Sequence, residues 1–383
     1  MNVQNKKLKI AMLGHKRIPS REGGIEIVVE ELSVRMVELG HSVTCYNRKG
    51  HHVSGVEFDV VAKTEYKGVK LKTVPTIERK GFAAVTSSLF ASCFAAFGHY
   101  DVVHIHAEGP AFFCWLPKLF GKRVVMTVHG IDWQREKWKS GFGSKFIHCG
   151  EKNAVKYADK IIVLSKSVQK YFKEKYGRRT VFIPNGVNRP EIIKADLITK
   201  RFDLCKNEYF LFLGRLVPEK GIRYLIKAFK EVKTDKKLVI AGGTSDTDKF
   251  TQELKELAKS DYRIIFTGFV QGKTLGELYS NAYVYVLPSD LEGMPISLLE
   301  AMSYGNCCVV SDIAECAEVV EDKGIKFKKG DTVDLREKLQ KCCDKPEMVA
   351  DYKTTVANFT YRKYDWNTVV ERTVELYTAE KQK

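Results

Sequence analysis

The chain has 383 residues, of which 44% are apolar and 29% are charged, and its formal net charge is +16. This length suits two domains, and the composition is ordinary for a globular protein, which excludes a disordered or fibrous chain. No stretch reaches the roughly 18 consecutive apolar residues of a membrane-spanning helix, and the polar, basic start lacks the apolar core of a secretion signal. We therefore expect a cytoplasmic protein.

The excess of positive charge lies entirely in the first half of the chain. Residues 1–190 contain 32 Lys and Arg against 16 Asp and Glu, whereas residues 191–383 contain 31 of each sign. Such a half is either a lysine-rich solvated surface or the face toward an anionic partner, such as a phosphate-bearing acceptor or the inner face of a plasma membrane. The basic helix expected over 167–176 is the candidate membrane-facing patch. No recognised nucleic-acid-binding motif accompanies the charge, so nucleic acid is not an expected partner.

Ten cysteines are scattered along the chain without a Cys-x-x-Cys pair. Several stand in apolar, strand-like company, as Cys307 and Cys308 do before Val309. We interpret all ten as reduced thiols of a cytosolic protein that act mainly as small core residues. The spacing of Cys and His predicts no metal site.

Apolar runs and helical stripes alternate along the first half of the chain. The glycine pair Gly23-Gly24 precedes a helical stripe, but the Gly-x-Gly-x-x-Gly dinucleotide motif is absent. A small, apolar helix over 82–97 is expected to be buried, with a membrane-lying helix as the alternative. The strands predicted here cover 8–13, 43–46, 58–62, 69–74, 101–106, 124–130 and 158–165, and the helices cover 25–39, 82–97, 111–119, 145–157 and 167–176.

A polar linker with little pattern, 188–206, separates this half from a second alternating series. The predicted strands of this series cover 209–213, 238–241, 264–268, 283–288 and 308–312, and the helices cover 222–232, 251–260, 275–281, 296–302, 335–343 and 369–377. The whole pattern predicts the α/β class, with two Rossmann-like domains of parallel sheets that face a central cleft. We expect the domains to be 1–187 and 188–365.

The stretch 289–302 follows the buried strand expected at 283–288 and combines a glycine-containing loop with a helix start at Ile296. In an open α/β sheet, ligands bind beyond the carboxyl ends of the strands, and the N–H groups of a helix start favour an anion. Glu292 and Glu300 are eight residues apart, a spacing that returns to nearly the same helix face, so both could hold one elongated ligand. Spacing alone leaves open the alternative of two solvated glutamates.

The amino-acid sequence of this stretch resembles the motif of a known family. Glu-Gly-Met-Pro-Ile-Ser-Leu-Leu-Glu at 292–300 resembles the Glu-x7-Glu signature of the retaining GT-B glycosyltransferases of family 4. Three further strings also resemble this family: Thr-x-His-Gly at 127–130, Gly-Arg-x-x-x-x-Lys-Gly at 214–221, and the string 14–48. The last is similar to a branch that includes the bacterial rhamnosyltransferases of polysaccharide assembly.

Two positions depart from the family pattern. Met294 stands where Phe is usual, and Glu22 stands where an aromatic residue usually precedes Gly23-Gly24. A carboxylate beside a pyrophosphate is unfavourable unless it points away. The departure at Glu22 therefore leaves the details of the donor or acceptor contact open.

The resemblance implies roles for individual residues. It places Glu292 and His129 beside the donor sugar, Glu300 on the nucleotide ribose, and Arg215 and Lys220 on the diphosphate. The expected catalytic residues are Glu292, His129, Arg215 and Lys220. The expected donor-binding residues are Gly23, Gly24, Gly214, Arg215, Lys220, Phe269, Gly293, Met294, Pro295, Ile296 and Glu300. The expected acceptor-binding residues are His15, Glu26 and Asp132.

The resemblance further implies the GT-B fold, with residues 1–187 on the acceptor side, residues 188–365 on the nucleotide-sugar side, and a last helix, 366–383, that packs back on the first domain. The implied activity is metal-independent, cofactor-free transfer of a hexose, for which rhamnose from TDP-rhamnose is the leading candidate. The implied acceptor is a saccharide, such as a lipid-linked one in cell-surface polysaccharide assembly, and peripheral attachment to the membrane would follow. The alternatives are a nucleotide-sugar epimerase on the same fold, a non-catalytic protein that binds nucleotide sugars or an anionic surface, and, on charge alone, a nucleic-acid-binding protein.

Overall fold

The computed structural model describes residues 7–50, 63–79, 82–131, 133, 141–243 and 248–379. Their contacts divide the chain into two compact units. Unit 1 runs to Gly186 and resumes at Trp366, and unit 2 is Val187–Asp365. The expected strand 58–62 lies outside the described residues.

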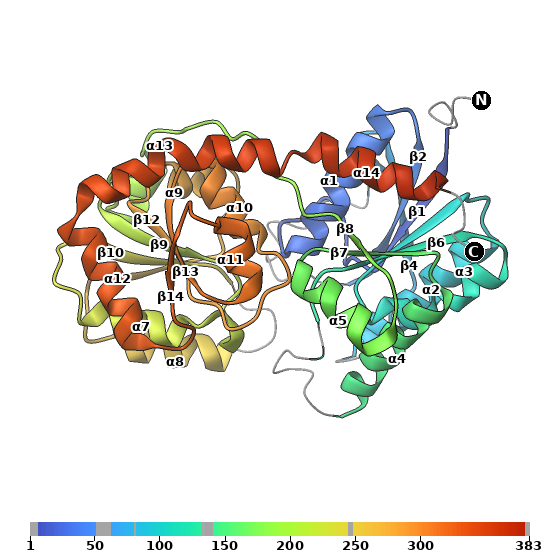
Figure 1. The fold of residues 1–383 in the computed structure, drawn as a ribbon, viewed down its shortest axis with the longest axis horizontal. Coiled ribbons are helices and arrows are strands. Elements are labelled where there is room, and N and C mark those ends of the chain that lie inside the picture. The colour runs from blue at the N-terminus through green and yellow to red at the C-terminus, as the bar shows by residue number, and fades with distance from the viewer. Residues whose placement is uncertain are drawn as a thin grey trace. The chain divides into compact units, whose positions relative to one another are not determined.

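Unit 1 is built on a twisted sheet with helices on both sides (Figure 1). Among the described residues the sheet has eight strands in the order β3-β4-β2-β1-β5-β6-β7-β8, all parallel except β3. The chain moves outward from β1 through β2 and β4, then returns to place β5 on the other side of β1. The strand order therefore reverses between β1 and β5, which is where ligands bind in open α/β sheets. The strands are β1 (Lys9–Leu13), β2 (Ser42–Arg48), β3 (Glu65–Tyr66), β4 (Val69–Val74), β5 (Val102–His106), β6 (Arg123–Val128), β7 (Lys160–Val163) and β8 (Val181–Phe182).

The helices of unit 1 include two departures from the sequence prediction. The expected helix 111–119 is divided into a 3-10 turn, η3, and the short helix α3, which meet at Cys114. Helix α2 forms as expected, but the expectation that it is buried is wrong, because its phenylalanines are exposed. The helices are α1 (Gly24–Glu38), α2 (Phe82–Phe97), η3 (Pro110–Phe113), α3 (Trp115–Leu119), α4 (Phe142–Tyr157), α5 (Lys166–Tyr176) and α14 (Trp366–Thr378).

Unit 2 repeats the same plan with a smaller sheet. In its described part, six parallel strands follow the order β11-β10-β9-β12-β13-β14, so the order reverses between β9 and β12. The core strands are continuous apolar runs because both faces of the sheet are covered by helices. The strands are β9 (Tyr209–Leu213), β10 (Lys237–Ala241), β11 (Ile264–Gly268), β12 (Val284–Leu287), β13 (Cys307–Ser311) and β14 (Ile325–Phe327).

The helices of unit 2 include three that periodicity did not predict: α6, α11 and α13. Helix α6 lies inside the expected linker 188–206, and the carboxylate of Glu277 fixes its start by accepting the N–H groups of Asp196 and Ile198 at 3.0 and 3.1 Å. A side chain some 80 residues away supplies this cap, so no local pattern announces it. The helices are α6 (Leu197–Phe202), η6 (Pro218–Lys220), α7 (Ile222–Lys230), α8 (Asp248–Ala258), α9 (Gly272–Asn281), α10 (Ile296–Ser303), α11 (Ala314–Val320), α12 (Thr332–Asp344) and α13 (Pro346–Lys363).

Helix α14 ends the described chain and packs on α1 within unit 1. Trp366 at its start is 3% exposed, and the guanidinium of Arg35 lies 5.8 Å from the centre of its ring. All ten cysteines lie in described positions, and all are free thiols. Within the described residues, no helix combines the length and apolar character that crossing a bilayer requires.

Candidate functional site

Unit 2 brings two predicted motifs together at the point where its strand order reverses. Gly214 and Arg215 follow β9, and Glu292 follows β12, the strand that pairs with β9. Between them η6 carries Lys220 to the same edge of the sheet. Residues 72 positions apart in the sequence therefore meet because the topology places the ends of β9 and β12 side by side.

The centre of this cluster is an ion pair between Lys220 and Glu292. The Nζ of Lys220 lies 2.5 Å from Oε1 of Glu292, and their side chains are 14% and 9% exposed. The hydroxyl of Ser289 also donates to Oε1 of Glu292, at 2.6 Å. Ser289 is held in turn, because its carbonyl accepts the hydroxyl of Ser311 at 2.5 Å. A nearly buried carboxylate with two fixed donors is a rigid group, and a lysine retains further N–H donors while it makes this contact.

Gly221 allows the Lys220 loop to approach the end of β12. Its φ of +67° lies in the left-handed region, and a Cβ built on it would stand 1.9 Å from the carbonyl oxygen of Pro288. Any larger residue would separate the two loops. The Lys-Gly pair of the predicted motif thus has a steric reason as well as a chemical one.

Glu300 lies on α10, and its carboxylate is held by a tyrosine from α9. The hydroxyl of Tyr279 donates to Oε2 of Glu300 at 3.1 Å and to the carbonyl of Ser297 at 3.2 Å. Burial, followed by the charge of Glu300, raises the pKa of Tyr279 well above its usual value, so the tyrosine remains a donor. Tyr279 therefore fixes the orientation of a carboxylate predicted to bind a ribose.

The remaining predicted donor-binding residues of unit 2 differ in how far they are buried. The side chains of Met294 and Ile296 are buried, at 8% and 9% exposure, so the backbone is the part of this loop that would meet a ligand. Helix α10 begins at Ile296 without a side-chain cap from any described residue, which leaves its first N–H groups to favour an anion. The half-buried or buried positions in this group are Gly214, Arg215, Phe269, Gly293 and Pro295.

Unit 1 places His129 at the end of β6, where it shares a hydrogen bond with a second histidine. His106 Nδ1 lies 2.9 Å from His129 Nε2, and the rings stack with centroids 5.2 Å apart. His106 itself stacks on His104 at 4.2 Å, and His104 bonds to Tyr377 of α14 at 2.6 Å and to Thr127 at 2.7 Å. This contact fixes the orientation of the His129 ring, and one of the two nitrogens carries the shared proton.

The histidines behind His129 are neutral because they are buried. Burial lowers the pKa of His15 to about 4 and that of His104 to about 3, and it lowers the pKa of His106 well below the usual value. Neighbouring histidines contribute in the same direction, since His129 lowers the pKa of both His104 and His106. Two buried nitrogens, His15 Nδ1 and His106 Nε2, have no hydrogen-bond partner among the described residues.

Two of the predicted acceptor-binding residues, His15 and Glu26, are buried in unit 1. His15 is 3% exposed and bonds to Asn47 at 3.1 Å. Glu26 is 6% exposed, accepts the N–H of Lys16 at 3.0 Å, and carries its other oxygen over Gly23. The start of α1 at Gly23 and Gly24 thus has a carboxylate of its own helix beside it. Asp132 lies outside the described residues.

Glu22, the departure from the family pattern, is held by a lysine. Its Oε2 lies 3.5 Å from the Nζ of Lys16, and its side chain is 4% exposed. Next to it, the guanidinium of Arg21 donates to the buried Glu30 at 2.8 Å. Each carboxylate around the start of α1 is therefore balanced by a cation or an N–H group.

Sequence reasoning missed the side chains that support the predicted ones. Ser289, Tyr279 and His106 hold Glu292, Glu300 and His129, respectively. Their only sequence signals are weak: Ser289 stands two residues after β12, and His106 is the second histidine of His-x-His at the end of β5. Among the described residues, no group of three or more His, Cys, Asp or Glu is arranged to hold a metal ion.

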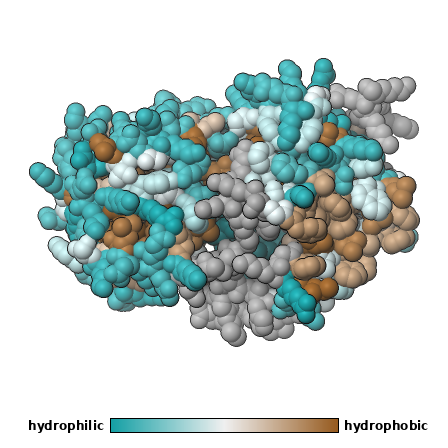
Figure 2. Space-filling model, turned by 90° about the horizontal axis from the view of Figure 1, so that it is seen from below, coloured by the Kyte–Doolittle hydropathy of each residue, from teal (hydrophilic) through white to brown (hydrophobic). Residues whose placement is uncertain are grey.

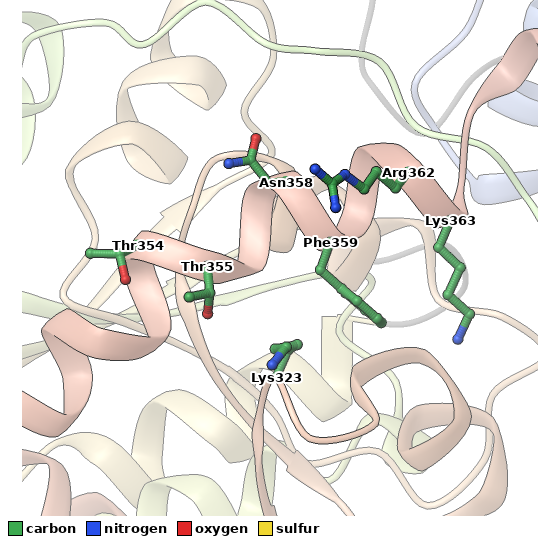
Figure 3. A pocket seen from close by; sticks show the side chains of 7 residues that line it. All are labelled: Lys323, Thr354, Thr355, Asn358, Phe359, Arg362 and Lys363. Carbon is green, nitrogen blue, oxygen red and sulfur yellow. The ribbon is translucent and has the colours of Figure 1, made fainter.

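A shallow groove of about 650 Å³ lies elsewhere on unit 2 (Figure 3). Helix α13 supplies most of its lining, and Lys323 stands just before β14, at the amino-terminal edge of the sheet. Lys220 and Glu292 lie at the opposite, carboxyl-terminal edge. Two of its lysines are already paired, Lys323 with Asp322 at 2.8 Å and Lys363 with Glu321 at 2.5 Å, so we assign the groove no part in the site. The lining residues are Lys323, Thr354, Thr355, Asn358, Phe359, Arg362 and Lys363.

Each unit contains a stretch that matches a glycosyltransferase family model. Residues 22–189 match the description "Glycosyltransferase Family 4", and residues 207–345 match "Glycosyl transferases group 1". An uncharacterized glycosyltransferase of Methanocaldococcus jannaschii is 27% identical over 97% of this chain and 98% of its own. The UDP-Gal:alpha-D-GlcNAc-diphosphoundecaprenol alpha-1,3-galactosyltransferase of Escherichia coli is 32% identical over 56% of this chain and 58% of its own.

Solved structures share the fold over nearly the whole chain. Sucrose-phosphate synthase from Thermosynechococcus elongatus superposes with a TM-score of 0.82 and 20% identity, covering 97% of this chain and 98% of its own. The Anabaena protein HepE, in complex with UDP and glucose, superposes with a TM-score of 0.78 and 16% identity, covering 96% of this chain and 98% of its own. Residues 22–189 are therefore a family 4 glycosyltransferase domain, residues 207–345 are a group 1 glycosyl transferase domain, and the chain has the GT-B fold.

Proposed function

We propose that this protein transfers a sugar from a nucleoside-diphosphate sugar to an acceptor hydroxyl and retains the configuration of the anomeric carbon. The observation that carries the proposal is the Lys220–Glu292 pair at the reversal of strand order in unit 2. This pair places a cation that can bind a diphosphate beside a carboxylate that can bind a sugar. Arg215 follows β9 at the same edge of the sheet.

The leaving group of such a reaction is a nucleoside diphosphate, whose negative charge grows as the bond to the sugar breaks. Cations and backbone N–H groups that the fold already holds in place stabilise this charge effectively, because they need not reorient as it develops. Lys220 has three N–H donors, so it can keep its contact with Glu292 and still donate to a phosphate oxygen. Arg215 and the start of α10 supply the remaining donors without requiring a metal ion.

Glu292 would orient the donor sugar. Among the described residues, the hydrogen bonds of this carboxylate both fall on Oε1, which leaves Oε2 for a sugar hydroxyl and for the positive charge that develops on the ring. Glu300, held by Tyr279, would bind the ribose. His129 of unit 1 would position the sugar or the acceptor, with His106 behind it.

In the reaction, the bond between the anomeric carbon and the diphosphate oxygen breaks with its electron pair remaining on the oxygen. The acceptor oxygen forms its bond to the same face of the carbon and passes its proton to the departing diphosphate. Glu292 is not required as a covalent nucleophile in this scheme. Excluding water from the site would suppress hydrolysis of the donor.

We propose rhamnose as the transferred sugar and a lipid-linked saccharide as the acceptor. The string 14–48 supports the first, and the galactosyltransferase relative, whose name contains a diphosphoundecaprenol acceptor, supports the second. The same relative and HepE are associated with UDP, so UDP sugars belong beside TDP-rhamnose in any donor screen. A bound donor raises the melting temperature by mass action, and a screen of nucleotide sugars therefore ranks the candidates.

Replacing Lys220 by Ala tests the central observation. Because the variant loses a preorganised donor to the leaving group, we expect kcat to fall by roughly a hundredfold or more. Lys227→Ala, an exposed lysine on the neighbouring α7, is the matched control and should retain full activity. Steady-state transfer to a saccharide acceptor, with and without EDTA, measures both the loss and the independence from metal.

Two outcomes would contradict the proposal. Undiminished kcat in a folded Lys220→Ala variant would remove the diphosphate assignment, and an inverted product anomer by NMR would remove retention. Incubating the enzyme with the donor alone distinguishes the epimerase alternative, since a transferase without acceptor yields no epimer.

A further inference from the structure

Helix α2 of unit 1 presents its large apolar side chains outward. Phe82, Leu89, Phe90, Phe94 and Phe97 are 58%, 37%, 37%, 45% and 69% exposed. Phe82 and Leu89 are seven residues apart, and Phe90, Phe94 and Phe97 follow at intervals of four and three, so all five lie on one face of the helix. A helix on the surface of a protein in water normally has the reverse arrangement, with polar residues on its outer face.

The inner face of α2 explains why the sheet side needs no large residues. Ser87, Ser88, Ala91, Ser92 and Ala95 are buried, and Ser87 and Ser88 donate their hydroxyls to carbonyls of the same helix, as Ser88 does to Ala84 at 2.6 Å. Small side chains allow a helix to approach its neighbours closely. The small residues therefore make the contact with the sheet. The phenylalanines contribute apolar surface to the outside, and Phe94 also meets the ring of Tyr46, with centroids 6.3 Å apart.

The neighbouring elements extend this apolar surface. Helix α3 packs against α2, and at its end Leu119 and Phe120 are 74% and 45% exposed. The ring of Phe120 meets that of Phe97 edge to face, with centroids 4.6 Å apart, and Trp115 adds a 38% exposed indole. Figure 2 shows hydrophobic surface gathered on the part of unit 1 where α2 and α3 lie. A contiguous apolar area of this kind marks an interaction surface.

A row of cations borders the apolar surface on α4, which packs against η3 and α3. Its exposed stripe runs through Phe142, Lys145, Lys152 and Lys156, again at helical spacing. Between residues 102 and 158, the acidic side chains that the structure describes, Glu108 and Glu151, are both fully buried. The exposed charge on this stripe is therefore positive.

We propose that this α2–α4 surface, formed by the exposed apolar residues of α2 and α3 and the lysines of α4, docks on an anionic phospholipid bilayer. Aromatic and leucine side chains would enter the boundary between headgroups and acyl chains, and the lysines would lie against the anionic headgroups. A second copy fits less well, because both sides of a two-fold interface would bring the same lysines and the described residues of the stripe offer no exposed carboxylate to pair with them. The proposal goes beyond the transferase activity and does not rest on it.

The helix that charge alone favoured, α5, fits a bilayer less well. Lys175 is paired with the buried Glu151 at 3.1 Å, Lys170 lies 3.8 Å from Glu174, and Arg178 donates to the carbonyl of Ala158 at 2.5 Å. Among the described residues of α5, no large apolar side chain is exposed. Several basic side chains of this region therefore pair with groups of the protein itself, and within the described part of α5 no exposed large apolar side chain lies beside them.

Flotation of the full-length protein with lipid vesicles tests the proposal. We expect binding to vesicles that contain phosphatidylglycerol, weaker binding to pure phosphatidylcholine, and a loss of binding as salt increases. Trp115 provides an independent signal: its emission should shift to the blue on binding, as shown by the difference between wild-type protein and Trp115→Phe.

Two pairs of variants separate the apolar and cationic contributions. Replacing both Phe94 and Phe97 by Gln should weaken binding by roughly tenfold or more, because two large apolar groups no longer leave water. Tyr262→Gln, at a 91% exposed position of unit 2, is the control and should bind normally. Replacing both Lys152 and Lys156 by Glu should weaken binding to anionic vesicles by about fivefold or more per lysine, and Lys170→Glu on α5 should not.

The following outcomes would overturn the proposal. The wild-type protein does not float with anionic vesicles, or the variant with Gln at Phe94 and Phe97 binds them as well as the wild type does. Self-association in sedimentation without lipid, abolished by the same phenylalanine variant, would identify a second copy as the occupant instead. Transfer to a water-soluble saccharide should be unchanged in all four variants, so a failure of membrane docking is distinguishable from a failure of the transferase assignment.

Discussion

Buried imidazoles are the side chains whose charge state the fold of unit 1 controls most strongly. His104 lies in the centre of β5 with both ring nitrogens bonded, to Tyr377 and to Thr127. Removal from water penalises the imidazolium form, so the pKa of His104 falls to about 3 and that of His15 to about 4. The same burial keeps His106 neutral and able to hold His129 in one orientation.

This burial makes stability depend on pH. Unfolded histidines take up a proton near pH 6.5, whereas these folded ones do so only near pH 4 or below, so the unfolded state binds more protons between these values. We therefore expect the histidines to make their full contribution to the free energy of unfolding above about pH 6.5. The free energy of unfolding should decrease as the pH falls toward 4. Urea denaturation at a series of pH values measures the slope.

His104→Gln identifies the source of this pH dependence. An amide can still bond to neighbouring hydroxyls but does not titrate, so the slope should decrease by about 1.4 kcal/mol per pH unit, the contribution of one proton. His99→Gln, at an exposed position, should leave the slope unchanged. Identical slopes in wild type and His104→Gln would show that His104 is not the group responsible.

At the scale of elements, the site of unit 2 depends on how closely two loops approach. The chain after β9 reaches Pro288 at the end of β12 only because Gly221 has no side chain. Gly330 offers a comparison, since its φ of +72° is nearly the same but a Cβ there would meet nothing within 4 Å. The pair separates backbone strain from steric contact.

We expect Gly330→Ala to lower the free energy of unfolding by about 1 kcal/mol, the cost of a left-handed conformation for alanine. Gly221→Ala adds a collision with a carbonyl oxygen and should cost roughly 3 kcal/mol or more, with loss of transferase activity as Lys220 moves. Urea denaturation and steady-state kinetics measure the two effects. Equal losses of stability in the two variants would mean that the β12 loop moves aside freely.

For the molecule as a whole, the chain leaves unit 1 at Gly186 and returns to it at Trp366. Helix α14 covers part of α1 and supplies Tyr377, which is 3% exposed and bonded to His104. Unit 1 therefore depends on residues that are synthesised after unit 2 is complete. The two units have separate cores but only one of them is continuous in sequence.

Truncation after Asp365 tests this dependence. Without α14, apolar surface on α1 and the hydrogen bond to His104 are exposed, so we expect amides of unit 1 to lose protection from hydrogen exchange while those of unit 2 keep it. Truncation after Thr378 is the control and should preserve both. Unchanged protection of unit 1 in the shorter chain would show that its core is complete without α14.

The parts of the fold that were predictable are those that local pattern encodes. Apolar runs such as 209–213 and 283–288 are predicted as strands and form β9 and β12, because strands covered on both faces are continuous in apolar residues. Helix α13 was missed, since its fully buried positions, Val349, Val356 and Thr360, are sparse over 18 residues. Helix α2 was expected inside because its composition is apolar, although composition does not say which face is turned inward.

By itself the sequence determined the alternation of strands and helices, the chemical groups at the strand ends and the excess of positive charge in the first half, because each is a property of neighbouring residues. Only the tertiary structure decided that Lys220 contacts Glu292, that His106 holds His129 and that the phenylalanines of α2 face outward. These contacts join residues from different elements, and strand order and packing distance decide which of them meet. Side-chain identity selects the chemistry of the candidate site, and topology brings it to one place.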